Sequence, residues 1–201
     1  MSPLSHIGFD ALSPDVAVKA VEAAFNLELQ SVITTYPSYV NRVYGLVDTD
    51  GVSYVAKYYR PGRWSREAIE EEHRFTRELA DEEFPVVSPL ADADGDTLAE
   101  VIVESGDDEM LFRFALFPKR GGRLFDAEGD EAWLRIGALC GRLHSIGGRD
   151  KAPHRQTILP EVSTGNHLKS LEIDDIVPAD LKNEFRDIAE ETLETIIPSF
   201  E

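Results

Sequence analysis

The chain has 201 residues, of which 42% are hydrophobic, so it can bury one large core or two small ones. Asp and Glu number 38 against 20 Lys and Arg, and the formal net charge of -18 repels nucleic acids and anionic membrane surfaces. We therefore expect no nucleic acid partner and no membrane attachment. The single cysteine excludes an internal disulfide, and we expect a monomeric, cytoplasmic protein.

The first part of the chain predicts one helix followed by three strands. Ser13 as N-cap and Pro14 at the first helical position mark the helix start, and apolar residues then recur at helical spacing up to Phe25. Three runs rich in β-branched and aromatic residues follow, at 31–36, 41–47 and 52–59. The last two are joined by Asp50-Gly51, a strong hairpin signal, so we expect antiparallel strands.

The next segment completes a predicted five-stranded antiparallel sheet. A helix is expected from about Ser65 to a point before Pro85, and two more strands at 97–104 and 110–117. Pro118 and the glycines after it break the strand pattern, so we place a domain boundary between residues 117 and 118. The fold class is therefore α+β.

Residues 118–201 are predicted to contain helices and loops only. One helix is expected at about 130–146 and another at 179–197, with a loop carrying Pro153 and Pro160 between them. Cys140 lies in the apolar pattern of the first of these helices, so we expect it to be buried.

A lysine near the end of the third strand is followed by an acidic helix, the arrangement with which kinases bind ATP phosphates. Alternation places Val55 and Lys57 on one face, which suits an adenine ring beside phosphates. Glu72 is the first choice of partner for Lys57 because it lies three residues before Phe75, beside the apolar stripe of the helix. Glu71 is the second choice. A strand lysine that simply faces water is the alternative.

The connection between the first two strands, residues 36–44, lies where a kinase folds a loop over the phosphates. It contains no glycine, so any phosphate contact would come from backbone NH groups and the Ser38 hydroxyl. An ordinary polar hairpin loop fits the same spacing. We interpret His73, next to Glu72, as a packing or capping group, and we find no spacing typical of a zinc site.

Five stretches of the chain match segments of a known protein family, in the same order and with the same spacing. They are residues 39–44, 55–64, 71–73, 117–123 and 141–144. They resemble the bacterial stress response kinase A family, which belongs to the aminoglycoside phosphotransferase and choline kinase group. The likeness runs from about Phe9 to the end of the chain, and the stretch Tyr59-Arg60-Pro61-Gly62-Arg63-Trp64 is fairly specific to the family.

The resemblance implies a protein-kinase-like fold and a cytoplasmic Ser/Thr protein kinase that uses ATP and magnesium in stress survival. It implies that Lys57 and Ser38 contact the nucleotide and that Glu72 is the partner of Lys57. The segment connecting the lobes near the adenine would be Ala115, Leu116 and Phe117. Residues 1–117 would form the nucleotide-binding lobe, and 118–201 the hinge and the start of an incomplete helical lobe.

One departure from the family is large. Its catalytic loop, His-Gly-Asp-x-His-x-Gly-Asn, and the metal-binding Asp after it do not occur in these 201 residues. We therefore expect the general base and the magnesium ligands beyond Glu201, no catalytic or metal-binding residue within the chain, and little or no phosphate transfer by it. Two alternatives stay open: a small-molecule kinase of the choline, homoserine or aminoglycoside type, and a non-catalytic nucleotide-binding fragment.

Overall fold

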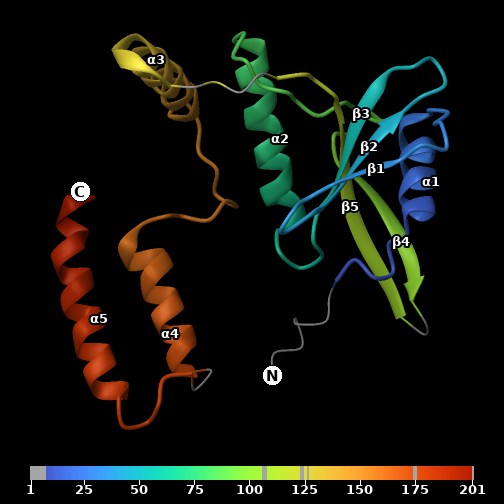
Figure 1. Cartoon of the computed structure of the whole chain (residues 1–201). Coiled ribbons are helices and arrows are strands. Elements are labelled where there is room, and N and C mark those ends of the chain that lie inside the picture. Colours follow the sequence, from blue (N-terminus) through green and yellow to red (C-terminus); the bar gives the residue numbers. More distant parts are fainter. Residues whose placement is uncertain (1–7, 106–107, 123–124, 126, 174–175, 201) are drawn as a thin grey trace. The chain divides into compact units, whose positions relative to one another are not determined.

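The computed structural model describes residues 8–105, 108–122, 125, 127–173 and 176–200 (Figure 1). The chain divides into two compact units, the first ending at His154 and the second beginning at Arg155. Residues 118–154 thus belong to the same compact unit as the sheet. The boundary after residue 117 was predicted as the end of the nucleotide-binding lobe, and it stays a prediction. No helix in the described ranges is long and apolar enough to span a bilayer.

Helix α1, Pro14–Phe25, begins and ends at the residues that its sequence signals predict. The Val16 N–H donates to Ser13 Oγ at 3.3 Å, and Pro14 stands in the first turn, where no backbone N–H is needed. The C-cap of the helix is Asn26, which adopts the left-handed conformation with φ 51°.

The five strands form one antiparallel sheet in the order β1-β2-β3-β5-β4, which confirms the predicted fold class. Their bounds are β1 Thr34–Tyr36, β2 Arg42–Val47, β3 Ser53–Tyr58, β4 Ala99–Ser105 and β5 Asp108–Pro118. Gly51, in the turn between β2 and β3, has φ +85°, a conformation that glycine adopts without strain.

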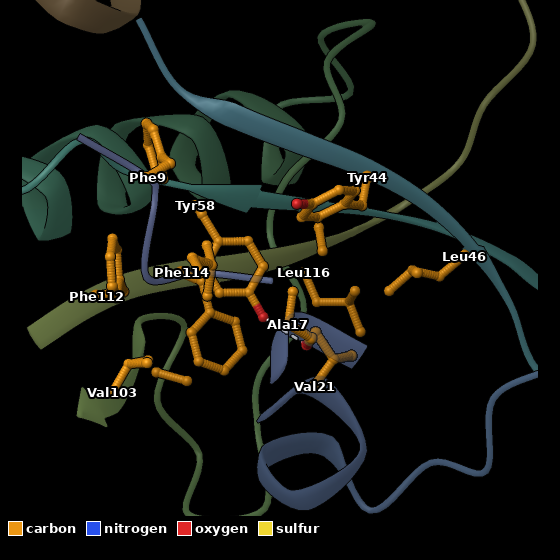
Figure 2. Packing of buried hydrophobic residues seen from close by; sticks show 13 residues of the cluster. Phe9, Ala17, Val21, Tyr44, Leu46, Tyr58, Val103, Phe112, Phe114 and Leu116 are labelled. Atoms are coloured by element: carbon orange, nitrogen blue, oxygen red, sulfur yellow. Dashed lines mark hydrogen bonds between the residues drawn. The ribbon is translucent and has the colours of Figure 1, made fainter. Parts of the chain in front are cut away.

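The larger hydrophobic core lies between α1 and one face of the sheet (Figure 2). Tyr58 stacks on Phe114 with ring centroids 4.8 Å apart, and the Tyr58 hydroxyl donates to the Ala17 carbonyl at 2.7 Å. Tyr58 and Ala56 are 0% exposed, so the even-numbered residues of β3 point into this core. Val55 and Lys57 consequently point to the opposite face.

Helix α2, Arg66–Asp81, covers part of that opposite face (Figure 1). The Ala68 N–H donates to Ser65 Oγ at 3.1 Å, so Ser65 is the N-cap, and the helix begins where it was predicted to begin. Ile69 of this helix packs in a second buried cluster with Tyr59, Leu98 and Ala115. Because α2 covers only part of this face, Val55 and Lys57 remain partly exposed.

Helix α3, Gly129–Gly147, contacts the C-terminal half of α2. Arg142 Nη2 donates to the Glu82 carbonyl at 3.0 Å, and the Phe75 ring lies against Gly147. The prediction that Cys140 is buried is wrong, because its side chain is exposed. The apolar stripe around it is also open, with Trp133 61% exposed.

The second unit contains more helix than predicted. A π-helical turn at Pro160–Thr164 leads into α4, Gly165–Ile173, where we expected a loop. Helix α5, Lys182–Ile196, followed by a 3-10 turn at Ile197–Ser199, matches the expected last helix within three residues. Pro160 does not break this helical segment, because it stands in the first turn, where its missing N–H costs nothing.

Candidate functional site

Lys57 and Glu72 form an ion pair on the sheet face opposite α1. Lys57 Nζ lies 2.9 Å from Glu72 Oε1, and the two side chains remain 25% and 33% exposed. Water therefore reaches both groups, so the ion pair contributes little to stability and the ammonium group stays accessible to an anion. Glu71 has a different partner, since its carboxylate accepts a hydrogen bond from the His154 N–H at 3.1 Å.

The strand register places an apolar surface beside this ammonium group. Val55 is the cross-strand neighbour of Gly45 on β2 and of Phe117 on β5, and all three face the same side as Lys57. The Tyr36 ring lies over Gly45, where an added Cβ would come within 2.8 Å of Tyr36 Cε2. An aromatic ring, a valine and a phenylalanine thus share one face with the cation.

Ser38 lies in the exposed loop between β1 and β2. Its hydroxyl oxygen accepts a hydrogen bond from the Asn41 N–H at 3.2 Å. The loop is tied to the segment after β3, because Arg60 Nε donates to the Val40 carbonyl at 3.1 Å and the Arg60 N–H donates to Asn41 Oδ1 at 3.4 Å. The loop is thereby fixed to a residue three positions after Lys57, while the role of Ser38 as a phosphate contact stays a prediction.

Ala115, Leu116 and Phe117 lie in a strand rather than in a connection, while their role as nucleotide contacts near the adenine stays a prediction. All three lie within β5, which continues to Pro118, so the connection begins only after that residue. Ala115 and Leu116 are 0% exposed, and their side chains pack in the two separate cores. Phe117 is half-buried, so it is the one of the three whose side chain can contact a ligand on this face.

A buried histidine, His73, follows Glu72 directly on α2. His73 is 1% exposed; its Nε2 lies 2.8 Å from the Tyr59 hydroxyl and its Nδ1 lies 3.0 Å from Thr97 Oγ1. Sequence reasoning assigned His73 to packing or capping and did not single out Tyr59. The position of Tyr59 two residues after Lys57, hence on the same face, is the signal that could have revealed it.

The electrostatic environment keeps this histidine neutral near pH 7. Burial is the main reason that the pKa of His73 falls to about 4, the nearby charge of Glu72 opposes this shift, and the positive charges of Lys57 and Arg77 add to it. No cluster of three or more His, Cys, Asp or Glu side chains suited to a metal ion occurs among the residues that the structure describes. The arrangement is therefore suited to binding a ligand with an aromatic ring and a negative charge.

Comparison with known proteins gives a consistent result. The sequence profile of the phosphotransferase enzyme family matches residues 32–193. Stress response kinase A of Escherichia coli (strain K12) is 33% identical over 188 residues, covering 94% of this chain and 54% of that protein. The serine/threonine protein kinase RdoA of Salmonella typhimurium (strain LT2) is 33% identical over 160 residues, covering 80% of this chain and 44% of that protein. The chain thus spans about half the length of these relatives.

Solved structures show the same fold. The amicoumacin kinase hAmiN, in complex with AMP-PNP, Ca2+ and Ami, has a TM-score of 0.64 at 19% identity and covers 92% of this chain and 54% of its own. A microcompartment-associated aminopropanol kinase has a TM-score of 0.57 at 17% identity and covers 74% of this chain and 46% of its own. The α+β fold is therefore protein-kinase-like. Because the profile match includes the whole sheet, α2 and the helices after it, the chain belongs to the phosphotransferase enzyme family.

Proposed function

We propose that this chain is the ATP-binding part of a kinase, in which Lys57 binds the nucleotide phosphates and Glu72 holds the ammonium group in place. The observation that carries the proposal is the 2.9 Å Lys57–Glu72 contact, which is partly open to solvent and lies on the same sheet face as Val55 and Phe117. Phosphates need a cation, and an adenine ring needs an apolar surface beside it.

In this proposal, the protein contributes by positioning and by charge neutralisation. Lys57 neutralises charge on the phosphate oxygens, Val55 and Phe117 contact the adenine, and backbone NH groups with the Ser38 hydroxyl cover the phosphates; a bound magnesium ion would supply further positive charge. The Asp that accepts the proton of the substrate hydroxyl and the magnesium ligands would be supplied by sequence after Glu201. The chain as given is then expected to transfer little or no phosphate.

The acceptor that we propose is a Ser or Thr hydroxyl of a protein, in a cytoplasmic, monomeric enzyme of the stress response. The names of the two curated relatives, stress response kinase A and serine/threonine protein kinase RdoA, support this acceptor. The alternative is a small-molecule hydroxyl, which the names of the amicoumacin and aminopropanol kinases favour, although at 19% and 17% identity these structures support the fold alone. The other alternative is a fragment that binds nucleotide without catalysing transfer.

The test is the affinity of residues 1–201 for ATP with Mg2+, measured by isothermal titration calorimetry. Lys57→Ala should weaken binding about tenfold or more, because a charged hydrogen-bonding partner of the phosphates is lost. Glu72→Gln should weaken binding about three- to tenfold, since an ion pair partner is lost. Glu71→Gln is the matched control on the same helix and should bind as the wild type does.

Two results would contradict the proposal. One is a wild-type chain that binds no ATP, and the other is an unchanged affinity in Lys57→Ala. A separate assay with radiolabelled ATP tests the expectation about transfer: robust phosphate transfer by residues 1–201 that Lys57→Ala abolishes would show that the catalytic groups lie within this chain.

A further inference from the structure

The ammonium group of Lys57 has a second contact besides Glu72. Lys57 Nζ lies 4.5 Å from the centroid of the Tyr59 ring, a distance typical of a cation–π interaction. Both side chains point to the α2 side of the sheet because they stand two residues apart on an extended segment, in which the Tyr59 N–H still donates to the Arg113 carbonyl at 2.9 Å. The ammonium group is therefore held by a carboxylate and by an aromatic ring.

The Tyr59 ring is fixed in turn by its surroundings. Tyr59 is 3% exposed and packs with Ile69, Leu98 and Ala115. Its hydroxyl is hydrogen-bonded to His73 Nε2 at 2.8 Å. Rotation of the ring away from the ammonium group would break this bond and disturb a buried cluster, so the ring face offered to Lys57 has one orientation.

His73 is itself held at its other nitrogen. Its Nδ1 lies 3.0 Å from Thr97 Oγ1, so a neutral imidazole satisfies one donor and one acceptor at its two nitrogens. Burial keeps the pKa of His73 low, at about 4, so this imidazole adds no positive charge near Lys57 at neutral pH. Because His73 follows Glu72 directly on α2, one helix turn supplies both the carboxylate and the imidazole.

We propose that Tyr59 and His73 are positioning residues for Lys57: His73 fixes the Tyr59 ring, and the ring restricts the ammonium group to the place where it meets nucleotide phosphates. This inference rests on the proposed function, because it assigns these residues to the same site. Lysine has many rotamers, and holding it before the ligand arrives lowers the entropy that binding must overcome. The simpler reading is that Tyr59 and His73 only fill space beneath α2.

The two interpretations predict different affinity changes, on substitution of Tyr59, for ligands with and without phosphates. Tyr59→Leu keeps an apolar side chain but removes the ring face, so ATP affinity should fall about three- to tenfold, the size of one cation–π contact. Adenosine has no phosphates and should bind as it does to the wild type. Leu98→Ala is the matched control: it disturbs the same cluster without touching Lys57 and should leave the ratio of ATP to adenosine affinities unchanged.

Proton NMR of the wild-type chain keeps the proposal testable if Tyr59→Leu does not fold. The ε-methylene protons of Lys57, assigned with Lys57→Arg, should be shifted upfield by the ring current of Tyr59. Resonances at the usual lysine position would overturn the proposal, as would equal losses of ATP and adenosine affinity in Tyr59→Leu or an unchanged ATP affinity in that variant. These outcomes are distinct from failure of the proposed function, in which Lys57→Ala binds ATP as tightly as the wild type.

Discussion

Replacing His73 with Gln should remove one pH-dependent part of the stability of this protein. Burial lowers the pKa of His73 to about 4, from 6.5 for an ordinary histidine. Between these values the unfolded chain binds a proton that the folded chain does not. The free energy of unfolding therefore contains a contribution that is fully present above pH 6.5 and is lost as the pH falls towards 4.

The two pKa values set the magnitude of this effect. Integration from pH 7.5 to pH 5 gives a loss of about 2 kcal/mol in the free energy of unfolding. Glutamine does not titrate, so His73→Gln should start less stable at pH 7.5, because it fits the Tyr59 and Thr97 hydroxyls less well. It should then lose about 2 kcal/mol less than the wild type over the same pH interval.

Urea unfolding at several pH values between 7.5 and 5, followed by far-UV circular dichroism, measures this difference. The range stops at pH 5 because Asp and Glu side chains titrate below it. His144→Gln, which replaces an exposed histidine on α3, is the matched control and should follow the wild type. If His73→Gln and the wild type lose stability in parallel across the range, the reasoning about burial of His73 is refuted.

Two further predictions concern the sheet. Tyr58→Phe removes a buried hydrogen bond to the Ala17 carbonyl and should cost about 1 kcal/mol, whereas Tyr44→Phe removes a buried hydroxyl that has no partner among the described residues and should be neutral or stabilising. Urea unfolding compares them, and equal losses would contradict this account. Gly45→Ala should cost about 1 kcal/mol, because its new Cβ would lie 2.8 Å from Tyr36 Cε2 and the half-buried Tyr36 ring must move aside. Adding Tyr36→Ala should restore part of the loss in the same assay, and no recovery would mean that this clash is not the cause.

The parts of the fold that were predictable depend on neighbours in the sequence. Ser13 and Ser65 mark helix starts because a cap bonds to an N–H three residues away. Alternation along β3 placed Lys57 on the same face as Val55, and helical spacing favoured Glu72 over Glu71 as its partner. The structure has the Lys57–Glu72 ion pair that the kinase-like arrangement and these two periodicities together favoured.

What was missed depends on contacts between distant residues. The hydrogen bonds of His73 to Tyr59 and to Thr97 join residues 14 and 24 positions apart, and no local sequence pattern predicts these bonds. The exposure of Cys140 likewise depends on what packs against α3, which the apolar spacing within that helix does not reveal. The segment at 160–173 was assigned to a loop carrying Pro160, although a proline in the first turn permits a helix.

The order in which the core residues occur along the chain bears on how the protein is made. The buried members of the larger cluster run from Phe9 to Leu116, so all of them have been synthesised before α3, α4 and α5. Domains acquire their structure during synthesis, starting from the N-terminal side. We therefore expect the sheet with α1 to fold on the ribosome while α4 and α5, which belong to the second unit, are still untranslated or inside the exit tunnel.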